Sequence, residues 1–600
     1  MDDQNKNLLL AFALSLLVII GWFALFPPPP PPEPVDTVTE TELLPPPATD
    51  TADAPGTDAT AAEETAADTI RIAIDTPRLT GSISLTGGRL DDLHLRDYRE
   101  TTDPDSDIVR LLNPVGSDRD IFYALHGWSP RGGLDIEHVP GPNTPWRQVG
   151  DNSLSPQTPV TLRWDNGQGL IFTRLIEIDD NFLFTITQSV ENRTGQAVTL
   201  NPYGILAQHG LPSDLENFFI SHEGMIQMAD GTLTEDSYRN MRNYRVDERE
   251  RTPASVTTVE ENGWIGLTGK YFMATLIGMP GQGFTAVAQH VPGADIYQTS
   301  MRMPAITVAP GDTGQVQSRL FAGAKEWTVI RNYEREANVD RFVDAIDWGW
   351  FFFLTKPIFS LLYFINSIIN NMGWSILVLT LIIKAVLLPL AWKSYVSMAR
   401  MKELQPEMLA IKERAGDDRQ KMQQEMMKLY KEKKVNPAAG CLPILLQIPI
   451  FFSLYKVIFV TIEMRHAPWI GVFNDLSAPD PTSIVNFFGL LPWAAPDPNS
   501  FAALILIGIM PLMFGTTMWL QMRLNPAPTD AMQATIFNWL PWVFMFILGG
   551  FASGLLLYWI WNNIITFVQQ YSIMRLNGTK PDLFGNIRET FKRKKGDEAK

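Results

Sequence analysis

Residues 376–390 read Ile-Leu-Val-Leu-Thr-Leu-Ile-Ile-Lys-Ala-Val-Leu-Leu-Pro-Leu, an apolar run with one lysine, Lys384, near its middle. The apolar window extends from Trp374 to Trp392, close to the roughly 20 residues that a helix needs to cross a hydrocarbon core of about 30 Å. A lysine at that depth costs on the order of 3 kcal/mol on insertion scales. The stretch therefore predicts a membrane-spanning helix that carries a functional cation.

The composition extends this prediction to a membrane protein with a large water-exposed part. Only 19% of the 600 residues are charged, against about 25% in soluble proteins. Acidic residues concentrate in the first half of the chain and long apolar runs in the second. The net charge of −16 argues against DNA as a partner. The single cysteine excludes a disulfide framework and a multi-cysteine metal site, and we predict neither a metal nor a cofactor.

The N-terminal region predicts an anchor followed by a tether. Leu8–Phe26 is an apolar run, and no small-residue cleavage site precedes the prolines at 27–32. Residues 1–26 are therefore predicted to be an uncleaved transmembrane anchor rather than a signal peptide. Residues 27–70 are rich in Pro, Ala, Thr and acids and contain no Lys or Arg, which predicts a disordered linker.

Residues 71–341 have the pattern of a β-domain. Short stretches rich in Val, Ile, Thr and Phe are separated by turn signals, and Phe182, Phe184 and Ile186 recur with a period of two. The predicted strands are 160–164, 170–178, 182–190, 284–290 and 306–308. A region of this size with many short strands predicts a large antiparallel β-sandwich. Its polar residues His222, Glu223 and Glu261 lack catalytic spacing and are expected to have surface or structural roles.

The second half predicts a polytopic α-helical bundle. Residues 372–392 and 438–575 hold five further spans, which with the anchor make six. Their apolar windows are 374–392, 438–462, 501–522, 533–549 and 554–571. Residues 342–371 are also apolar but contain Lys356-Pro357, and we predict an interfacial amphipathic helix there instead of a seventh span.

Charge predicts the orientation of the bundle. The loop at 393–437 and the tail at 576–600 are both basic, and the positive-inside rule places such segments in the cytoplasm. Only a six-span model places the basic loop and the basic tail on the same side of the membrane. The same model places both termini in the cytoplasm. The β-domain then lies on the other side of a bacterial inner membrane, in the periplasm.

The basic loop itself predicts a cytoplasmic helical hairpin. Its methionines recur at three- and four-residue steps along the two limbs, and they are Met398, Met401, Met408, Met422 and Met426. These side chains either form the core of the hairpin or offer an adaptable apolar surface to hydrophobic segments, a role that suits unbranched methionine.

Polar groups from three spans are expected at one depth. Lys384 lies about 12 Å from the cytoplasmic end of its helix, and Gln447 lies about 13–14 Å along the next span. Asn562 and Asn563 have a similar depth in the last span. Because no carboxylate lies in a neighbouring span, the ammonium of Lys384 is expected to face water in a recess open to the cytoplasm. The amides serve that recess or hold the helices together.

Several motifs between Asp347 and Met574 form a specific set. They are Asp347-Trp-Gly-Trp, Asn371-Met-Gly-Trp-Ser, Asn436-Pro-Ala-Ala-Gly-Cys-Leu-Pro-Ile-Leu-Leu-Gln-Ile-Pro and Ala552-Ser-Gly-Leu-Leu-Leu-Tyr-Trp. In these motifs the chain resembles the YidC/Oxa/Alb family of membrane protein insertases, in its Gram-negative form with a large periplasmic domain.

The resemblance implies a multi-domain membrane protein with a conserved five-helix core, a preceding anchor and a periplasmic β-supersandwich. It implies an insertase and chaperone without covalent catalysis, which places nascent membrane proteins in the bilayer alone or with the Sec translocon. It also implies contacts with membrane lipids, and with the ribosome through the cytoplasmic loops and basic tail.

The resemblance also implies a hydrophilic groove open to the cytoplasm and to lipid. The family's groove residues fall on Lys384, Thr380, Gln447, Ile448, Pro449 and Trp559, beside Asn562 and Asn563. The polar members would hydrate the groove and attract acidic substrate flanks, and the apolar members would form a path into lipid. Lys384 stands where relatives usually have Arg, and Trp559 stands at a position that is often Tyr.

Two other functions stay open at this level. A solute transporter would use Lys384 as a substrate or proton site. A periplasmic enzyme acting on carbohydrates would rest on fold analogy alone.

Overall fold

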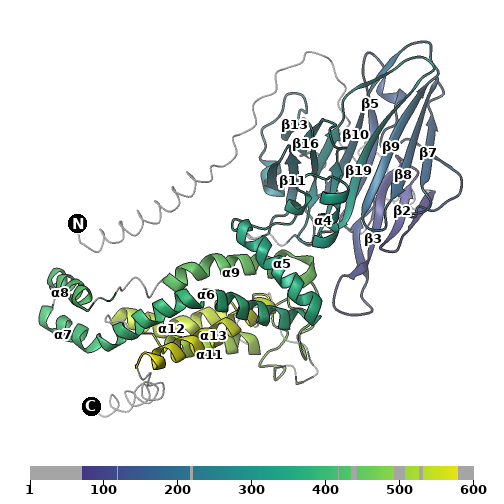
Figure 1. Cartoon of the computed structure of the whole chain (residues 1–600). Coiled ribbons are helices and arrows are strands. Elements are labelled where there is room, and N and C mark those ends of the chain that lie inside the picture. Colours follow the sequence, from purple (N-terminus) through teal and green to yellow (C-terminus); the bar gives the residue numbers. More distant parts are fainter. Residues whose placement is uncertain are drawn as a thin grey trace.

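The computed structural model describes residues 70–578, with gaps at 118, 216–220, 417, 434, 436–441, 489, 492, 494–506 and 526–530. A β-rich unit lies beside a bundle of helices (Figure 1). The predicted anchor, the linker up to residue 69 and the tail beyond Gly578 lie outside the described residues.

The β-rich unit consists of two antiparallel sheets, as predicted. The first sheet has ten strands, in the order β1-β2-β3-β5-β10-β17-β16-β13 with β4 beside β3 and β18 beside β10. Its strands are β1 (Arg71–Asp75), β2 (Leu79–Ser84), β3 (Arg89–Arg99), β4 (Ile108–Leu112), β5 (Phe122–Pro130), β10 (Val198–His209), β13 (Ala254–Val259), β16 (Phe284–Val291), β17 (Ile296–Arg302) and β18 (Ile306–Val308).

The second sheet has nine strands, in the order β12-β11-β14-β15-β19-β9-β8-β7-β6. They are β6 (Arg147–Val149), β7 (Val160–Asp165), β8 (Leu170–Ile178), β9 (Leu183–Asn192), β11 (Gly224–Ala229), β12 (Thr232–Ser237), β14 (Gly263–Thr268), β15 (Phe272–Ile277) and β19 (Thr313–Ala324). The five predicted strands are confirmed as β7, β8, β9, β16 and β18. In β9, Phe184 and Ile186 are buried while Thr185 and Thr187 are partly exposed, which confirms the predicted period of two.

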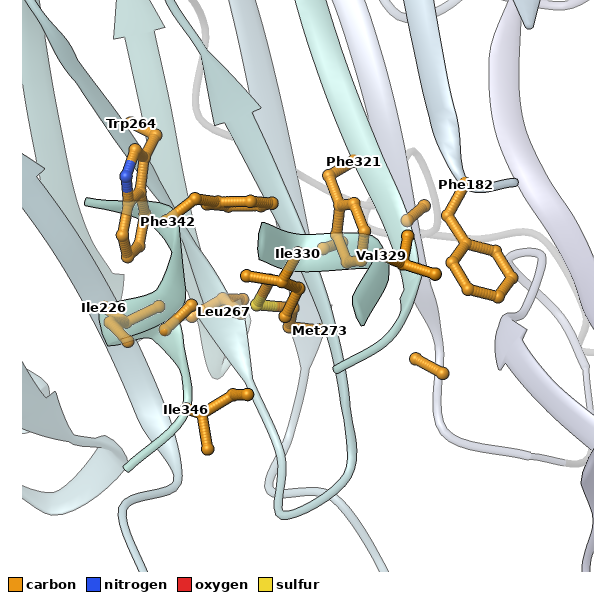
Figure 2. Close-up of a cluster of buried hydrophobic side chains, with 14 of the residues drawn as sticks. Phe182, Ile226, Trp264, Leu267, Met273, Phe321, Val329, Ile330, Phe342 and Ile346 are labelled. Atoms are coloured by element: carbon orange, nitrogen blue, oxygen red, sulfur yellow. The ribbon is translucent and has the colours of Figure 1, made fainter. Parts of the chain in front are cut away.

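Two short helices cover the nine-stranded sheet. α4 (Trp327–Glu336) and η2 (Phe342–Ala345) place Ile330 and Phe342 against the strand residues Phe321 and Leu267 (Figure 2). The rings of Phe321 and Phe342 meet edge to face, with centroids 5.3 Å apart. The β-domain therefore continues past the predicted boundary at residue 341, because the residues after it complete the same apolar core.

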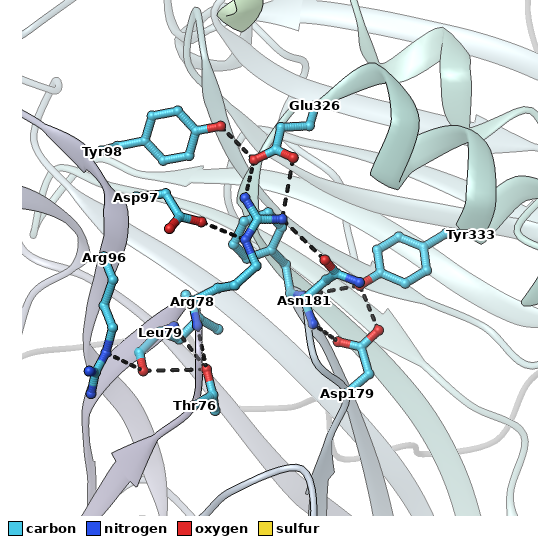
Figure 3. Close-up of polar contacts among 11 residues, drawn as sticks. Thr76, Arg78, Leu79, Arg96, Asp97, Tyr98, Asp179, Asn181, Glu326 and Tyr333 are labelled. Carbon is cyan, nitrogen blue, oxygen red and sulfur yellow. Dashed lines mark hydrogen bonds and ion pairs between the residues drawn. The ribbon is translucent and has the colours of Figure 1, made fainter.

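A polar network holds the start of α4 to the other sheet. Arg78, just before β2, donates hydrogen bonds to the carboxylate of Glu326, and the hydroxyl of Tyr98 in β3 donates to the same carboxylate (Figure 3). Arg78 Nη1 also donates to Asn181 Oδ1 at 3.1 Å. Burial and the nearby Glu326 raise the pKa of the Tyr98 phenol. The network joins both sheets to the helix that leads out of the domain.

The second unit is helical. Its helices are α5 (Phe352–Ile369), α6 (Met372–Glu403), α7 (Gln405–Ala415), α8 (Arg419–Glu432), α9 (Leu442–Val460), α11 (Ile509–Met522), α12 (Ala531–Ile547) and α13 (Ser553–Leu576). Among the described residues, α5 and α6 are long and apolar enough to cross a membrane, and shorter apolar helices cover 447–460 and 535–547. The six spans and the interfacial position of α5 therefore stay predictions.

Two predicted boundaries differ from the observed helices. α5 begins at Phe352, because the residues before it belong to the β-domain core. α6 does not break at Trp392 but runs for 32 residues to Glu403, so Met398 and Met401 belong to α6. The apolar window is therefore only the first part of one continuous helix, and a membrane boundary need not coincide with a helix end.

The hairpin consists of α7 and α8, which turn at Gly416 with a positive φ of 55°. Its core contains Leu404, Met408, Ile411, Leu429 and Val435, and Met401, Met422 and Met426 pack against it. These four methionines thus support the core interpretation. Contact between the predicted methionines and a substrate stays a prediction.

Candidate functional site

Lys384 of α6 joins three helices. Its ammonium donates a hydrogen bond to Thr566 Oγ1 of α13 at 2.9 Å. It also donates to Gln447 Oε1 of α9 at 3.4 Å. The structure therefore brings Lys384 and Gln447 together, as their predicted depths implied. In the described part of the chain, no carboxylate lies within ion-pair distance of this ammonium.

Two hydroxyl groups on α13 complete the cluster, and neither was predicted. Gln447 donates its amide to the hydroxyl of the buried Tyr558, and Thr566 is buried beside Lys384. Tyr558 and Thr566 are eight residues apart, with Asn562 midway, so all three share one helix face. The spacing predicts that the three side chains share a face, but it does not predict which helices that face contacts.

The two asparagines of α13 lie apart from this cluster. Both are more than nine-tenths buried. Asn563 Nδ2 donates to Thr517 Oγ1 of α11 at 3.4 Å. Asn562 Oδ1 has no hydrogen-bond partner among the described residues. Neither amide bonds to Lys384 within the described ranges, and Asn563 instead links α13 to α11.

Thr380 is also buried, one helical turn before Lys384. Its hydroxyl donates to the carbonyl of Ile376 at 2.7 Å, within α6 itself. The donor of this hydroxyl is therefore satisfied by the helix backbone. Its predicted role in a groove stays a prediction.

The predicted apolar residues lie on α9 and α13. Trp559 stacks on Phe451 with centroids 4.8 Å apart and planes 8° apart, and on Phe514 at 5.2 Å. Ile448 is 44% exposed, and Pro449 is partly buried next to it. The stack couples α9, α11 and α13, and it leaves Ile448 at the surface.

The three helices of the cluster are packed unequally. α6 and α13 pack along much of their length, whereas α9 packs mainly on α5 and meets α6 and α13 over a short stretch. Trp561 Nε1 of α13 donates to the carbonyl of Leu377 in α6 at 3.1 Å, which secures that pair. Lys384 therefore connects the α6–α13 pair to α9.

The other end of α9 is bound to the β-domain. Lys456 forms an ion pair with Asp347 at 2.5 Å. Glu463, just after α9, accepts a hydrogen bond from the backbone N–H of Trp327 at 2.9 Å. Burial raises the pKa of the Glu463 carboxyl to about 7. The polar side chain of Gln447 thus sits on a helix whose far end is held by the β-domain.

Known protein families match both the β-rich unit and the helical unit. The family described as the YidC periplasmic domain matches residues 71–361, and the family described as 60Kd inner membrane protein matches residues 364–580. The chain is 62% identical to the membrane protein insertase YidC of Dinoroseobacter shibae, over 100% of both chains. It is 59% identical to that of Cereibacter sphaeroides, over 99% of this chain and 96% of the relative.

One solved structure is also similar. It is a crystal structure of an active YidC insertase with its first transmembrane domain resolved, 17% identical to this chain with a TM-score of 0.34. The match covers 84% of this chain and 92% of that one.

Proposed function

The chain belongs to the YidC family of membrane protein insertases, and on that premise we propose that it inserts nascent membrane proteins through a hydrophilic groove between α6, α9 and α13. The groove opens to the cytoplasm and to lipid. A polar segment that enters it crosses less than the roughly 30 Å of hydrocarbon that it would otherwise have to pass.

The observation that carries this proposal is the environment of Lys384. Its ammonium is held by two neutral acceptors, Thr566 and Gln447. Neutral acceptors position a cation but do not cancel its charge, so the site keeps a positive field inside an apolar wall. Such a field attracts the acidic flank of a substrate that is to be moved across the membrane.

The neighbouring apolar surface provides the path along which a substrate helix enters lipid. Ile448 is exposed one residue after Gln447 on α9, and Trp559 follows Tyr558 on α13. Gln447 and Tyr558 therefore each have a large apolar residue next to them in sequence. A substrate helix leaves the polar cluster along these side chains and enters lipid.

The proposal includes the partners and the topology that the family resemblance implies. The α7–α8 hairpin and the basic tail face the cytoplasm and contact the ribosome, and the bundle works alone or beside the Sec translocon within the membrane lipids. Both termini are cytoplasmic and the β-domain is periplasmic. The family is one of inner-membrane proteins with a periplasmic domain.

Site-specific photocrosslinking tests the groove. Photoreactive residues at Gln447 and Trp559 are expected to form adducts with a ribosome-stalled membrane protein. Val568 is the matched control, since it is 55% exposed on α13 and lies nine residues from Trp559, on the opposite helix face at about 100° per residue. Adducts at Val568 but not at Gln447 and Trp559 would contradict the groove.

A further inference from the structure

The loop between α9 and α11 contains an uncharged stretch. The sequence has no Asp, Glu, Lys or Arg between Asp480 and Asp497. The structure describes residues 482–493 of this stretch except 489 and 492, and we call these residues the 482–493 segment. Loops that lie in water are mostly polar. A stretch of this composition therefore indicates a surrounding other than water.

The side chains of the 482–493 segment are buried and exposed in the opposite sense to those of a soluble protein. The polar residues Thr482, Ser483 and Asn486 are buried, each no more than 4% exposed. The exposed side chains are large and apolar, and they are Ile484, Val485, Phe487, Leu490, Leu491 and Trp493. Apolar surface that is gathered in this way is unfavourable in water and favourable in hydrocarbon.

Hydrogen bonds within the segment satisfy its polar groups. Asn486 Oδ1 accepts from the backbone N–H of Ser483 at 2.8 Å. The indole Nε1 of Trp493 donates to the carbonyl of Val485 at 2.9 Å, and the backbone N–H of Leu491 donates to the carbonyl of Asn486 at 3.0 Å. A backbone that enters hydrocarbon has to satisfy its polar groups within the protein. These groups of the segment meet that requirement.

Contacts with the start of α11 give the level of the segment. The hydroxyl of Thr482 accepts from the backbone N–H of Ile509 at 2.9 Å. The backbone N–H of Ile484 donates to the carbonyl of Ile507 at 3.3 Å. Both partners belong to the apolar window 501–522, which predicts a membrane span. The segment is therefore level with part of that span and does not lie beyond its end.

The surroundings of the segment are also apolar. On α11, Leu512 and Met513 are 37% and 42% exposed. The first part of the same loop lies at the start of α6, where the ring of Trp469 meets that of Trp374 edge to face, with centroids 5.8 Å apart. Tryptophan is enriched where hydrocarbon meets water. The loop thus begins at a tryptophan pair of this kind and continues to a helix with an exposed apolar surface.

We propose that the 482–493 segment inserts into the bilayer leaflet on the side of the β-domain and binds lipid acyl chains through its exposed apolar side chains. The side follows from Arg465, early in the same loop, which donates to the carbonyl of Arg99 in the β-domain at 2.6 Å. A protein partner fits less well, because a protein interface surrounds its apolar centre with a polar rim. All exposed side chains of the described segment are apolar.

The inserted segment would fix the depth of α11, because its backbone is bonded to the start of that helix. The inference requires the membrane location of the family and does not depend on the groove at Lys384.

Fluorescence quenching by lipids tests the insertion. The full-length protein with Cys441→Ser, which removes its single cysteine, receives Phe487→Cys or Leu490→Cys. Each variant is labelled with nitrobenzoxadiazole and placed in nanodiscs of phosphatidylethanolamine and phosphatidylglycerol. Val246→Cys is the matched control, since Val246 is an apolar residue of the β-domain and is 66% exposed.

The labels at Phe487 and Leu490 are expected to emit at shorter wavelength than the label at Val246. Lipids with a doxyl group on an acyl chain should quench the two labels in the segment and leave the control unchanged. Emission at both positions like that of the control would overturn the proposal. A shift to shorter wavelength without quenching would also overturn it, because another part of this chain, a second copy or a protein partner would then cover the side chains.

Paired charges test whether the apolar side chains carry the contact. The variant Phe487→Asp/Leu490→Asp, labelled at Ile484→Cys, is expected to lose the quenching, because carboxylates are unfavourable in hydrocarbon. The control Phe487→Leu/Leu490→Phe exchanges the two residue types, stays apolar and is expected to keep it. Quenching that persists in the Asp variant, or that is lost equally in the control, would overturn the proposal.

Discussion

At the scale of single residues, Lys384 is a cation with hydrogen-bond partners but no counter-charge. Lysine offers three donors on a compact ammonium, and Thr566 and Gln447 accept from it. Arginine at this position would present a planar fork suited to two acceptors on one group. The two acceptors here lie on different helices, an arrangement that a point-like ammonium satisfies without a planar partner.

This arrangement predicts the effect of Gln447→Glu. A carboxylate at this position would pair with Lys384 and would accept a hydrogen bond from the Tyr558 hydroxyl, which reverses the present bond from the Gln447 amide. The free energy of unfolding is therefore expected to rise by about 1 kcal/mol. Insertion is expected to fall toward the level of Lys384→Leu, because the positive field is cancelled. Thermal unfolding in micelles and insertion of a small reporter membrane protein measure the two effects.

Gln447→Met is the control for this prediction. It has a similar volume, loses the bonds to Lys384 and Tyr558, and keeps the charge of Lys384. It is expected to be less stable than the wild type and to insert better than Gln447→Glu. If Gln447→Glu inserted the reporter protein as well as the wild type does, the charge of Lys384 would not be what attracts the substrate.

At the scale of elements, α9 connects the polar cluster to the β-domain. Gln447 bonds to α6 and α13 near one end of the helix, and Glu463 accepts from the first residue of α4 just beyond the other. Glu463 Oε2 has no hydrogen-bond partner within the described ranges. In the described residues, therefore, only one of the two carboxylate oxygens has a hydrogen-bond partner where α9 meets the β-domain.

The raised pKa of the Glu463 carboxyl predicts a pH dependence of the free energy of unfolding. Because the folded-state pKa of Glu463, about 7, exceeds its ordinary value of 4.5, its contribution to stability is complete below pH 4.5 and is lost as the pH rises through 7. The wild type is expected to lose about 1 kcal/mol from this group between pH 6 and 8. Glu463→Gln keeps the acceptor for Trp327 and removes the titration.

Urea unfolding at pH 6, 7 and 8 measures this difference. The stability of Glu463→Gln should fall less over this range than that of the wild type. Glu336→Gln, at the exposed end of α4, is the control and should follow the wild type. Parallel pH profiles for Glu463→Gln and the wild type would rule out Glu463 as the titrating group.

The elements differ in how far the sequence predicts them. The strands around Phe184 were predictable because a period of two reports burial directly. The end of α6 was not, since hydropathy marks where a helix leaves lipid and not where its hydrogen bonding stops. Lys384 and Gln447 were predictable from their depth. Thr566 was not, because hydroxyls are common in apolar helices and their partners depend on helix rotation.

At the scale of the whole molecule, the residues that line the cavity of about 640 Å³ between the β-domain and the segment after α9 come from distant parts of the chain. Asp120, Tyr238 and Arg465 are brought together only by the two sheets and the joint with α9. No local pattern marks such a site, so it could not be predicted from the sequence. The amino-acid composition of the β-domain indicates its fold class but does not indicate where this cavity lies.

The predicted topology is testable in whole cells. In a Cys441→Ser background, a cysteine at Asp103 is expected to react with a membrane-impermeant maleimide added to spheroplasts, because the β-domain is periplasmic. A cysteine at Glu413 in the exposed face of α7 should react only after permeabilisation. Labelling of Glu413→Cys in intact spheroplasts would favour α5 as an additional span.

The unbroken course of α6 has a mechanical consequence. Its 32 residues span about 48 Å at 1.5 Å per residue, well beyond a hydrocarbon core of about 30 Å. Pro389 lies inside this helix, between Lys384 and the end that leads into the hairpin, and an internal proline is a common position for a bend. The roughly 14 residues from Pro389 to Glu403 span about 21 Å, so a bend of about 10° at Pro389 would move the hairpin end of α6 by about 4 Å relative to Lys384.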